Sequence, residues 1–191
     1  MNKIIGILGM QGAIAEHQEI LMQILHTKTR IVKTAKDLDC IDGLILPGGE
    51  STAIGKLLDY FSLKEILRQK IISGLPVFGT CAGLILLAKN IENQTNTHLA
   101  TMDITVKRNG YGSQLDSFST NLLIPTIDKN MPIPLVFIRA PYITKTDKDV
   151  QILATLDNKI IAARQKNMLV SSFHPELTCD LRFHQYFLSM I

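Results

Sequence analysis

Cysteine is scarce in this sequence, tryptophan is absent and no long apolar run occurs. The 191 residues include only three cysteines, Cys40, Cys81 and Cys179, and no two of them form a C-x-x-C pair. An odd and sparse set of this kind predicts neither a disulfide framework nor a zinc site. The first apolar segment ends at Gly9, which makes it too short for a signal peptide or a membrane span. We therefore expect a cytoplasmic protein with reduced thiols, no membrane association and no metal or other cofactor.

Concentrated positive charge is also missing. Twenty Lys and Arg residues against 17 Asp and Glu residues leave a net charge of +3, and the basic residues are scattered along the chain. Nucleic-acid binding requires a clustered basic footprint, so we do not expect a nucleic-acid partner. With 46% hydrophobic and 19% charged residues, the chain has the composition of a folded protein. Its length suits one domain over residues 1–191 that buries roughly 70% of the unfolded surface.

Apolar runs alternate with helical spacing over the first 90 residues, which predicts a doubly wound, mostly parallel α/β sheet. The expected strands lie at about 4–8, 30–33, 42–46 and 75–78. The expected helices lie at about 13–26, with Ile14, Leu21 and Leu25 on one face, at 63–71 ending near Gly74, and from Leu84 through Ala88. Further strand-like runs occur at 102–106, 120–124, 134–138, 150–155, 159–163 and 168–173, before a helical tail at 180–191. We expect these later strands, some of them antiparallel, to extend or flank the main sheet.

The segment Gly79-Thr80-Cys81-Ala82-Gly83 joins an expected strand to an expected helix. Glycines on both sides of a nucleophile allow the tight turn that exposes its side chain, and the helix start stabilises a thiolate. A small buried cysteine packed at a helix start is the alternative interpretation.

A second segment, Phe173-His174-Pro175-Glu176, follows the strand-like run that ends at Ser172. Proline disfavours the helical region for the residue before it, so we expect His174 to be extended. Residues two apart in an extended chain point to the same side, which would let Glu176 accept a hydrogen bond from Nδ1–H of His174. A surface histidine beside an unrelated glutamate is the alternative.

A third segment, Pro47-Gly48-Gly49-Glu50-Ser51, also follows an apolar strand. Adjacent glycines let backbone N–H groups approach a ligand, as in an oxyanion hole or an anion nest. The acidic residue favours an ammonium or amide partner over phosphate, whereas a plain type II turn is the alternative.

Taken together, the three segments supply a nucleophile, a base, an acid that orients the base, and oxyanion donors. The other histidines, His17, His26, His98 and His184, have no acid placed in the sequence to make them bases, so we expect them to be structural.

The order of the three segments resembles class I glutamine amidotransferases, which use a Cys-His-Glu triad. A closer resemblance, to the family of glutaminase subunits of pyridoxal 5′-phosphate synthase, spans nearly the entire chain. It is carried by LGMQGA at 8–13, LILPGGEST at 44–52, FGTCAGLILLAK at 78–89, RNGYGSQLDSF at 108–118, FIRAP at 137–141 and SSFHPEL at 171–177. The resemblance implies a three-layer, flavodoxin-like α/β fold.

The resemblance also implies the role of each site residue. Cys81 would attack the carboxamide of L-glutamine, His174 would transfer protons, and Glu176 would hold His174. The oxyanion would be bound by the backbone of Gly48, Gly49 and Ala82, with Gln11 ordering that site. The substrate would be held by Gly49, Glu50, Ser51, Arg108, Ile138 and Arg139, although surface ion pairs are an alternative for the two arginines.

In that family the ammonia enters a (β/α)₈-barrel synthase subunit, and twelve glutaminase subunits surround a core of twelve synthase subunits. The resemblance therefore implies this partner, and weak activity before docking. Ser113 departs from the arginine common in bacterial members. Three alternatives stay open: the glutaminase of another ammonia-channelling enzyme, a Cys-elbow protease or chaperone, and a silent regulatory subunit.

Overall fold

The structure is a computed structural model that describes residues 2–110 and 117–191. Its first half contains β1 (Lys3–Leu8), α1 (Ile14–Met22), β2 (Thr27–Val32), the 3-10 helix η1 (Ala35–Cys40), β3 (Gly43–Leu46), α2 (Ser51–Tyr60), α3 (Lys64–Ile72), β4 (Val77–Thr80), α4 (Ala82–Leu87) and β5 (Ala88–Ile91). Its second half contains β6 (Met102–Lys107), β7 (Ser117–Leu122), β8 (Ile133–Ile138), β9 (Tyr142–Thr146), β10 (Gln151–Leu156), β11 (Lys159–Gln165), β12 (Met168–Ser171), the 3-10 helix η2 (Pro175–Leu177) and α5 (Arg182–Leu188).

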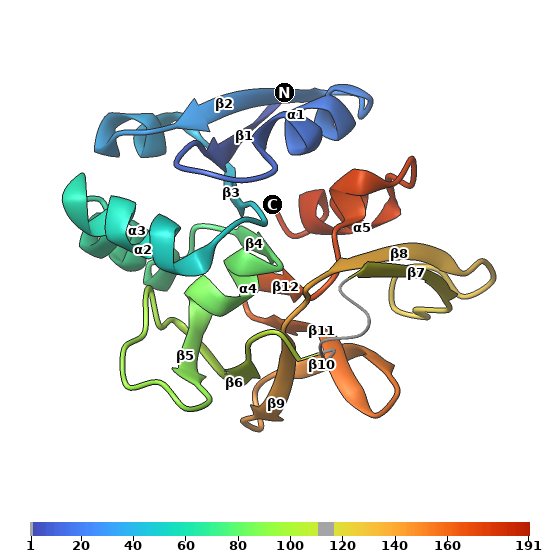
Figure 1. Ribbon diagram of the computed structural model, residues 1–191. Coiled ribbons are helices and arrows are strands. Elements are labelled where there is room, and N and C mark those ends of the chain that lie inside the picture. The colour runs from blue at the N-terminus through green and yellow to red at the C-terminus, as the bar shows by residue number, and fades with distance from the viewer. Residues whose placement is uncertain (1, 111–116) are drawn as a thin grey trace.

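One large sheet organises these elements, with strand order β2-β1-β3-β4-β12-β11-β9-β6-β5 and β10 paired to β11 (Figure 1). The strands from β2 to β12 are parallel, whereas β11 runs antiparallel to both β12 and β9, and β9 to β6. This arrangement confirms the predicted doubly wound sheet with added antiparallel strands. The antiparallel hairpin β7–β8 forms a separate two-stranded sheet that flanks the main one.

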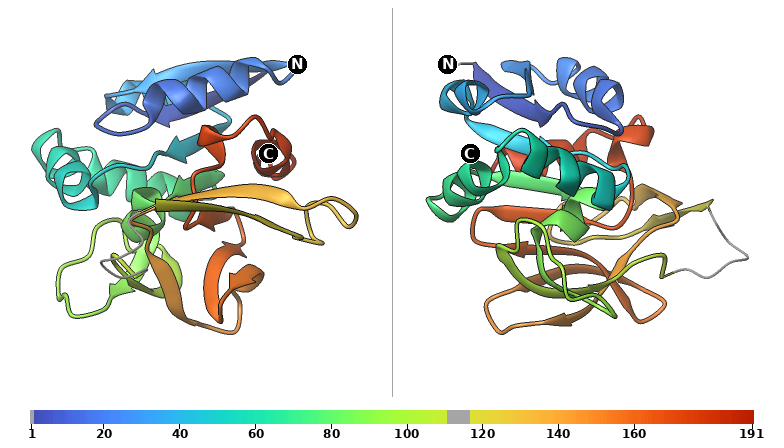
Figure 2. Two further views of the ribbon diagram at one scale, coloured as in Figure 1. Left: turned by 45° about the vertical axis from the view of Figure 1, so that its right-hand side comes forward. Right: turned by 60° about the vertical axis from the view of Figure 1, so that its left-hand side comes forward.

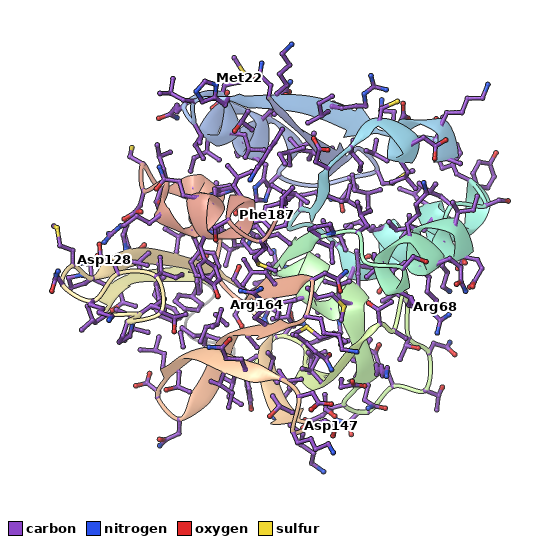
Figure 3. The ribbon with its side chains drawn as sticks, turned by 180° about the vertical axis from the view of Figure 1, so that it is seen from behind. Met22, Arg68, Asp128, Asp147, Arg164 and Phe187 are labelled. Carbon is purple, nitrogen blue, oxygen red and sulfur yellow. The ribbon has the colours of Figure 1, made fainter. Side chains whose placement is uncertain are left out.

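Two apolar layers cover the parallel strands, one on each face. Ile7 and Ile45 pack with Leu21 of α1 and Phe187 of α5, on the face that those helices cover. Their chain neighbours point the other way, because side chains alternate along a strand, and pack with α2 and α3. Figure 2 shows α5 on one side of the central strands and α2 and α3 on the other. Phe187 lies inside the first layer, whereas Met22 lies on the outer side of α1 (Figure 3).

Several predicted boundaries are wrong. The first helix ends at Met22 rather than near residue 26, because β2 begins at Thr27, and Leu25 is exposed instead of lying on the buried face. The helix expected through Ala88 ends at Leu87, and the chain continues as β5 because Ala88 and Ile91 pair with β6. By contrast, Gly74 follows the end of α3 with a φ of 110°, as its position in the sequence predicted.

The parallel arrangement determines where loops gather. Because β1, β3, β4 and β12 are adjacent and parallel, their carboxyl ends lie at one edge of the sheet. The chain leaves that edge through the three segments singled out in the sequence and through the Gly9–Gly12 loop after β1. Ligands of doubly wound sheets bind at this edge.

Candidate active site

Cys81 occupies a sharp turn between β4 and α4. Its φ of 47° and ψ of −96° are strained for a residue with a side chain, and its N–H donates to Ser171 O on β12 at 2.8 Å. The turn depends on close backbone approach, since a Cβ on Gly83 would lie 2.2 Å from Leu46 O. The geometry is that of a nucleophile elbow, in which a small residue lets the helix start abut the neighbouring strand.

His174 and Glu176 form a buried pair beyond the end of β12. Nδ1 of His174 lies 2.7 Å from Oε1 of Glu176, and the N–H of His174 donates to Val136 O on β8 at 2.8 Å. The expected hydrogen bond between the two side chains is confirmed, and His174 lies outside the helical region with φ −107° and ψ 86°. The expected strand alternation is wrong, because Pro175 begins the 3-10 helix η2 and Glu176 lies inside it. The short helical turn, rather than strand alternation, brings the carboxylate onto the imidazole.

Cys81 and His174 come close enough to interact although 93 positions separate them in the sequence. Burial alone would lower the pKa of His174. Its hydrogen bonds with Cys81 and Glu176, and the charges of both partners, outweigh burial and raise the pKa to about 10. Burial would likewise raise the pKa of Glu176, but His17 and His174 bring it below its ordinary range. The site therefore favours an imidazolium at His174, beside Cys81 and held by the carboxylate of Glu176.

The loop after β3 lies directly against this pair. A Cβ on Gly48 would come within 2.3 Å of the imidazole of His174, so only glycine lets the loop pack there. Gly48 O accepts from Ala13 N at 3.0 Å, and Gln11 Oε1 accepts from Glu50 N at 2.8 Å. The segment containing Gln11 and Ala13 therefore holds the Gly-Gly loop beside His174. Ala82, the first residue of α4, follows Cys81 directly, and a first-turn N–H has no acceptor within its helix.

Glu50 and Arg108 form an ion pair at the rim of the site. Arg108 Nη2 lies 3.1 Å from Glu50 Oε1, and its Nη1 donates to Thr52 Oγ1 at 3.2 Å. Glu50 also caps α2, accepting from the N–H groups of Thr52 and Ala53. Burial would raise the pKa of Glu50, but these hydrogen bonds and Arg108 lower it. The pair therefore places one carboxylate and one guanidinium at the rim of the site.

These groups surround a cleft of about 660 Å³. Of the residues expected at the site, it is lined by Gln11, Gly48, Gly49, Glu50, Ser51, Cys81, Arg108, Ile138, Arg139 and His174. Glu176 and Ala82 do not line it; Glu176 lies behind His174. Ile138 O lies 4.0 Å from Cys81 Sγ, and Arg139 follows it with a φ of 43°.

The cleft also contains residues that the sequence analysis did not select, namely Gly12, Ala13, Glu16, Ile85, Asn109, Pro141 and Leu177. Most are neighbours of selected residues along the chain. Glu16 and Ile85 lie in the first turns of α1 and α4, which follow Gly12 and Cys81, so the helix starts could have indicated them. Ser113 falls outside the described residues.

The expectation that His17 has no acid partner is wrong. His17 is fully buried in α1, and its Nε2 lies 3.5 Å from Oε2 of Glu176. The acid comes from the other end of the chain, so no local spacing could reveal it. Cys40 and Cys179, by contrast, are exposed free thiols away from the cleft.

Neither a metal-binding cluster nor a membrane-spanning helix is found among the described residues. No group of three or more His, Cys, Asp or Glu side chains among residues 2–110 and 117–191 is arranged to hold a metal ion. In the same ranges, no helix combines the length and the apolar character needed to cross a bilayer.

Comparison with known proteins gives a consistent result. The chain matches the SNO glutamine amidotransferase family over residues 7–191. It is 55% identical over 187 residues to the pyridoxal 5′-phosphate synthase subunit PdxT of Carboxydothermus hydrogenoformans, covering 98% of this chain and 97% of that protein. It is 53% identical over 189 residues to the subunit of the same name from Ruminiclostridium cellulolyticum, covering 99% of this chain and 100% of that protein.

Solved structures agree on the fold. A crystal structure of a glutamine amidotransferase matches with a TM-score of 0.91 at 39% identity, covering 97% of each chain. PurLQS from Thermotoga maritima, at 15% identity, has a TM-score of 0.72 over 99% of each chain and shares the fold. The predicted class I amidotransferase-like fold is thereby confirmed. From the extent and identity of these matches, the chain belongs to the SNO glutamine amidotransferase family.

Proposed function

We propose that this chain hydrolyses L-glutamine to L-glutamate and ammonia, and that the ammonia serves the synthesis of pyridoxal 5′-phosphate. The observation that carries the proposal is that Cys81 and His174 line one cleft and that Glu176 lies 2.7 Å from Nδ1 of His174. Thiol, imidazole and carboxylate in this order are the groups of nucleophilic acyl transfer. Family membership and the names of the relatives support the same chemistry.

In the first half-reaction, the Cys81 thiolate attacks the carbon of the glutamine carboxamide, and an S–C bond forms as the carbonyl electrons move onto oxygen. N–H groups around Gly48, Gly49 and Ala82 hold this oxyanion, and Gln11 orders their loop. One donor of this kind contributes about 3–4 kcal/mol in other hydrolases. The C–N bond then breaks, and His174 supplies the proton that lets ammonia leave.

In the second half-reaction, water hydrolyses the glutamyl thioester. His174, now neutral, removes a proton from the water, whose oxygen attacks the thioester carbon. The C–S bond breaks, glutamate leaves, and the thiolate of Cys81 is restored beside a protonated His174. Glu176 keeps its negative charge throughout and stabilises the imidazolium each time it forms.

The cleft rim accounts for recognition of an amino acid. A free amino acid carries an ammonium and a carboxylate, and the Glu50–Arg108 pair offers a counter-charge to each. Arg139 provides a second cation for the carboxylate. We assign the remaining contacts to Gly49, Ser51 and Ile138.

The proposed partner is a (β/α)₈-barrel synthase subunit, in an assembly of twelve synthase and twelve glutaminase subunits in the cytoplasm. Support comes from the relatives, which are named as subunits of pyridoxal 5′-phosphate synthase. In this assembly residues 1–191 act as a single glutaminase domain.

Release of glutamate from glutamine, measured with and without the synthase subunit, tests the hydrolysis. We expect Cys81→Ala to abolish it, because the nucleophile is lost, and Cys179→Ala to leave it unchanged, because that thiol is exposed and away from the cleft. Glutamate release by the Cys81→Ala protein at the parent rate would contradict the mechanism.

A further inference from the structure

A second buried polar cluster lies directly behind the triad. It comprises His17 of α1, Thr80 at the end of β4, His184 of α5 and the far oxygen, Oε2, of Glu176. His17, Thr80 and His184 have no exposed surface. Burying two imidazoles in an apolar layer costs free energy unless their ring nitrogens have polar partners.

His17 is in contact through both ring nitrogens. Its Nδ1 lies 3.0 Å from Nε2 of His184, while its Nε2 lies 3.2 Å from Thr80 Oγ1 and 3.5 Å from Oε2 of Glu176. Thr80 immediately precedes the nucleophile, and Glu176 holds the base. His17 therefore contacts Glu176 and the residue before Cys81, and it does not line the cleft.

The contacts of the two histidines determine which of their ring nitrogens carry protons. Only one proton can lie between His17 Nδ1 and His184 Nε2. If His17 supplied it, its bare Nε2 could accept from the Thr80 hydroxyl at 3.2 Å, but its lone pair would also face the Glu176 carboxylate at 3.5 Å, which is repulsive. The favourable arrangement has His184 Nε2–H donating to His17 Nδ1, and His17 Nε2–H directed at Glu176 and Thr80. It also leaves Nδ1 of His184, which has no hydrogen-bond partner among the described residues, as a bare acceptor rather than a buried N–H.

Both histidines are uncharged in this arrangement. Burial lowers the pKa of His17, an effect that His174 reinforces and that Glu176 and Glu16 oppose. Burial and the neighbouring His17 lower the pKa of His184 to about 3. A neutral N–H supports the carboxylate of Glu176 without cancelling its charge, so the full charge remains available to His174.

We propose that His17 is a positioning residue for glutamine hydrolysis. Its Nε2–H, 3.5 Å from Oε2 of Glu176, is the polar group that faces this oxygen, which makes no hydrogen bond among the described residues, and it favours the orientation that keeps Oε1 on His174. His184 determines which nitrogen of His17 carries the proton. This inference rests on the proposed glutaminase function, and it adds α1 and α5 to the elements that hold the triad. A purely packing role is the competing account, since His17 and His184 also contact the ring of Phe78 edge-on.

Two amide substitutions distinguish a positioning role of His17 from a packing role. The amide of His17→Gln reaches the place of Nε2, beside Glu176, whereas that of His17→Asn reaches only the place of Nδ1, beside His184. We expect His17→Gln to retain most of kcat and His17→Asn to lose on the order of ten- to a hundred-fold, the range seen when partners of metal-bound histidines are removed. KM for glutamine should stay within about twofold in both, because the cleft contacts are intact.

Ile20→Val, on the same buried face of α1, is the matched control for loosened packing and should keep kcat. If His17→Gln and His17→Asn lose kcat equally, or His17→Asn keeps it, the proposal is wrong. Should either protein fail to fold, nuclear magnetic resonance of ¹⁵N-histidine-labelled parent protein still decides. We expect neutral His17 with its proton on Nε2, and a proton on Nδ1 overturns the proposal whether or not the chain hydrolyses glutamine.

Discussion

At the scale of single residues, Cys81 shows how the fold makes a thiol available. Its backbone has a positive φ, a conformation that a residue with a Cβ adopts at a cost of roughly 1–3 kcal/mol. The hydrogen bond to Ser171 O and the packing of Gly83 on Leu46 hold the turn in place. The side chain consequently leaves the sheet edge toward His174 instead of pointing into the core.

Glu176 permits a prediction at the same scale. We expect Glu176→Gln to lower kcat by roughly three to four orders of magnitude, as loss of the carboxylate does in serine-protease triads, because the amide favours the wrong tautomer of His174. Without the carboxylate charge, burial dominates, and the pKa of His174 should fall well below about 10. Steady-state kinetics and titration of labelled His174 by nuclear magnetic resonance measure the two effects.

The raised pKa of His174 also links the site to stability. Because its pKa in the folded chain is about 10 against an ordinary value of 6.5, its contribution to the free energy of unfolding is fully present below pH 6.5. That contribution is lost as the pH rises from 6.5 to about 10. We therefore expect the free energy of unfolding, measured by urea denaturation, to fall less steeply over this pH range in Glu176→Gln. Glu19→Gln, an exposed change on α1, is the control. A His174 pKa unchanged in Glu176→Gln would contradict the assigned role of the carboxylate.

At the scale of elements, the sequence predicted those strands and helices whose signals are local. The apolar strands that end in glycine or proline, and α3 with Gly74 after it, follow from periodicity and turn chemistry. The helix α2 was missed because its cap, Glu50, is not among the usual N-cap residues. The strand β5 was missed because its partner, β6, is distant in sequence and strand formation depends on that pairing.

The same distinction applies to the site. The cysteine turn, the His174–Glu176 segment and the glycine loop could be selected from the sequence because each has its own pattern at a strand end, and the structure places all three at one cleft. The contact between His17 and Glu176 was not, since it joins α1 to η2 only after the sheet has formed. The 3-10 turn at Pro175 was missed because a proline restricts the backbone of the histidine before it but does not determine the conformation of the residues after it.

Asn167 permits a prediction for the elements remote from the cleft. Its side-chain amide donates to the carbonyl oxygens of Ile71 and Leu75, at 2.9 and 2.7 Å, and so binds the end of α3 to the start of β12. We expect Asn167→Ala to lower the free energy of unfolding by about 2 kcal/mol, because two carbonyl acceptors lose their partner. Urea denaturation measures this loss.

Asn121→Ala, on the exposed side of β7, should change the stability by less than about 0.5 kcal/mol and is the matched control. Because Asn167 precedes the amino end of β12 and the cleft lies at the carboxyl end, kcat should be unchanged. An equal loss of stability in both variants would show that the amide contacts contribute nothing.

At the scale of the whole molecule, the residues that stabilise the sheet and the residues that line the cleft lie in different places. The hydrophobic layers on its two faces hold the strands, and four adjacent carboxyl ends bring the chemical groups to one edge. The cleft thus lies at one end of the parallel strands, and under the proposed function a partner subunit receives ammonia from this end.

This arrangement leads to a prediction for the complete enzyme. With the synthase subunit, the two sugar phosphates and glutamine labelled with ¹⁵N at the amide, we expect pyridoxal 5′-phosphate that retains the label even in excess unlabelled ammonium, because the ammonia passes directly between subunits. Mass spectrometry measures the retention. The Cys81→Ala complex should form product only from the added ammonium and without label. Dilution of the label to the level of the bulk ammonium in the parent complex would mean that ammonia escapes to solvent. Absence of any product with glutamine, despite glutamate release, would assign the chain to another ammonia-consuming partner.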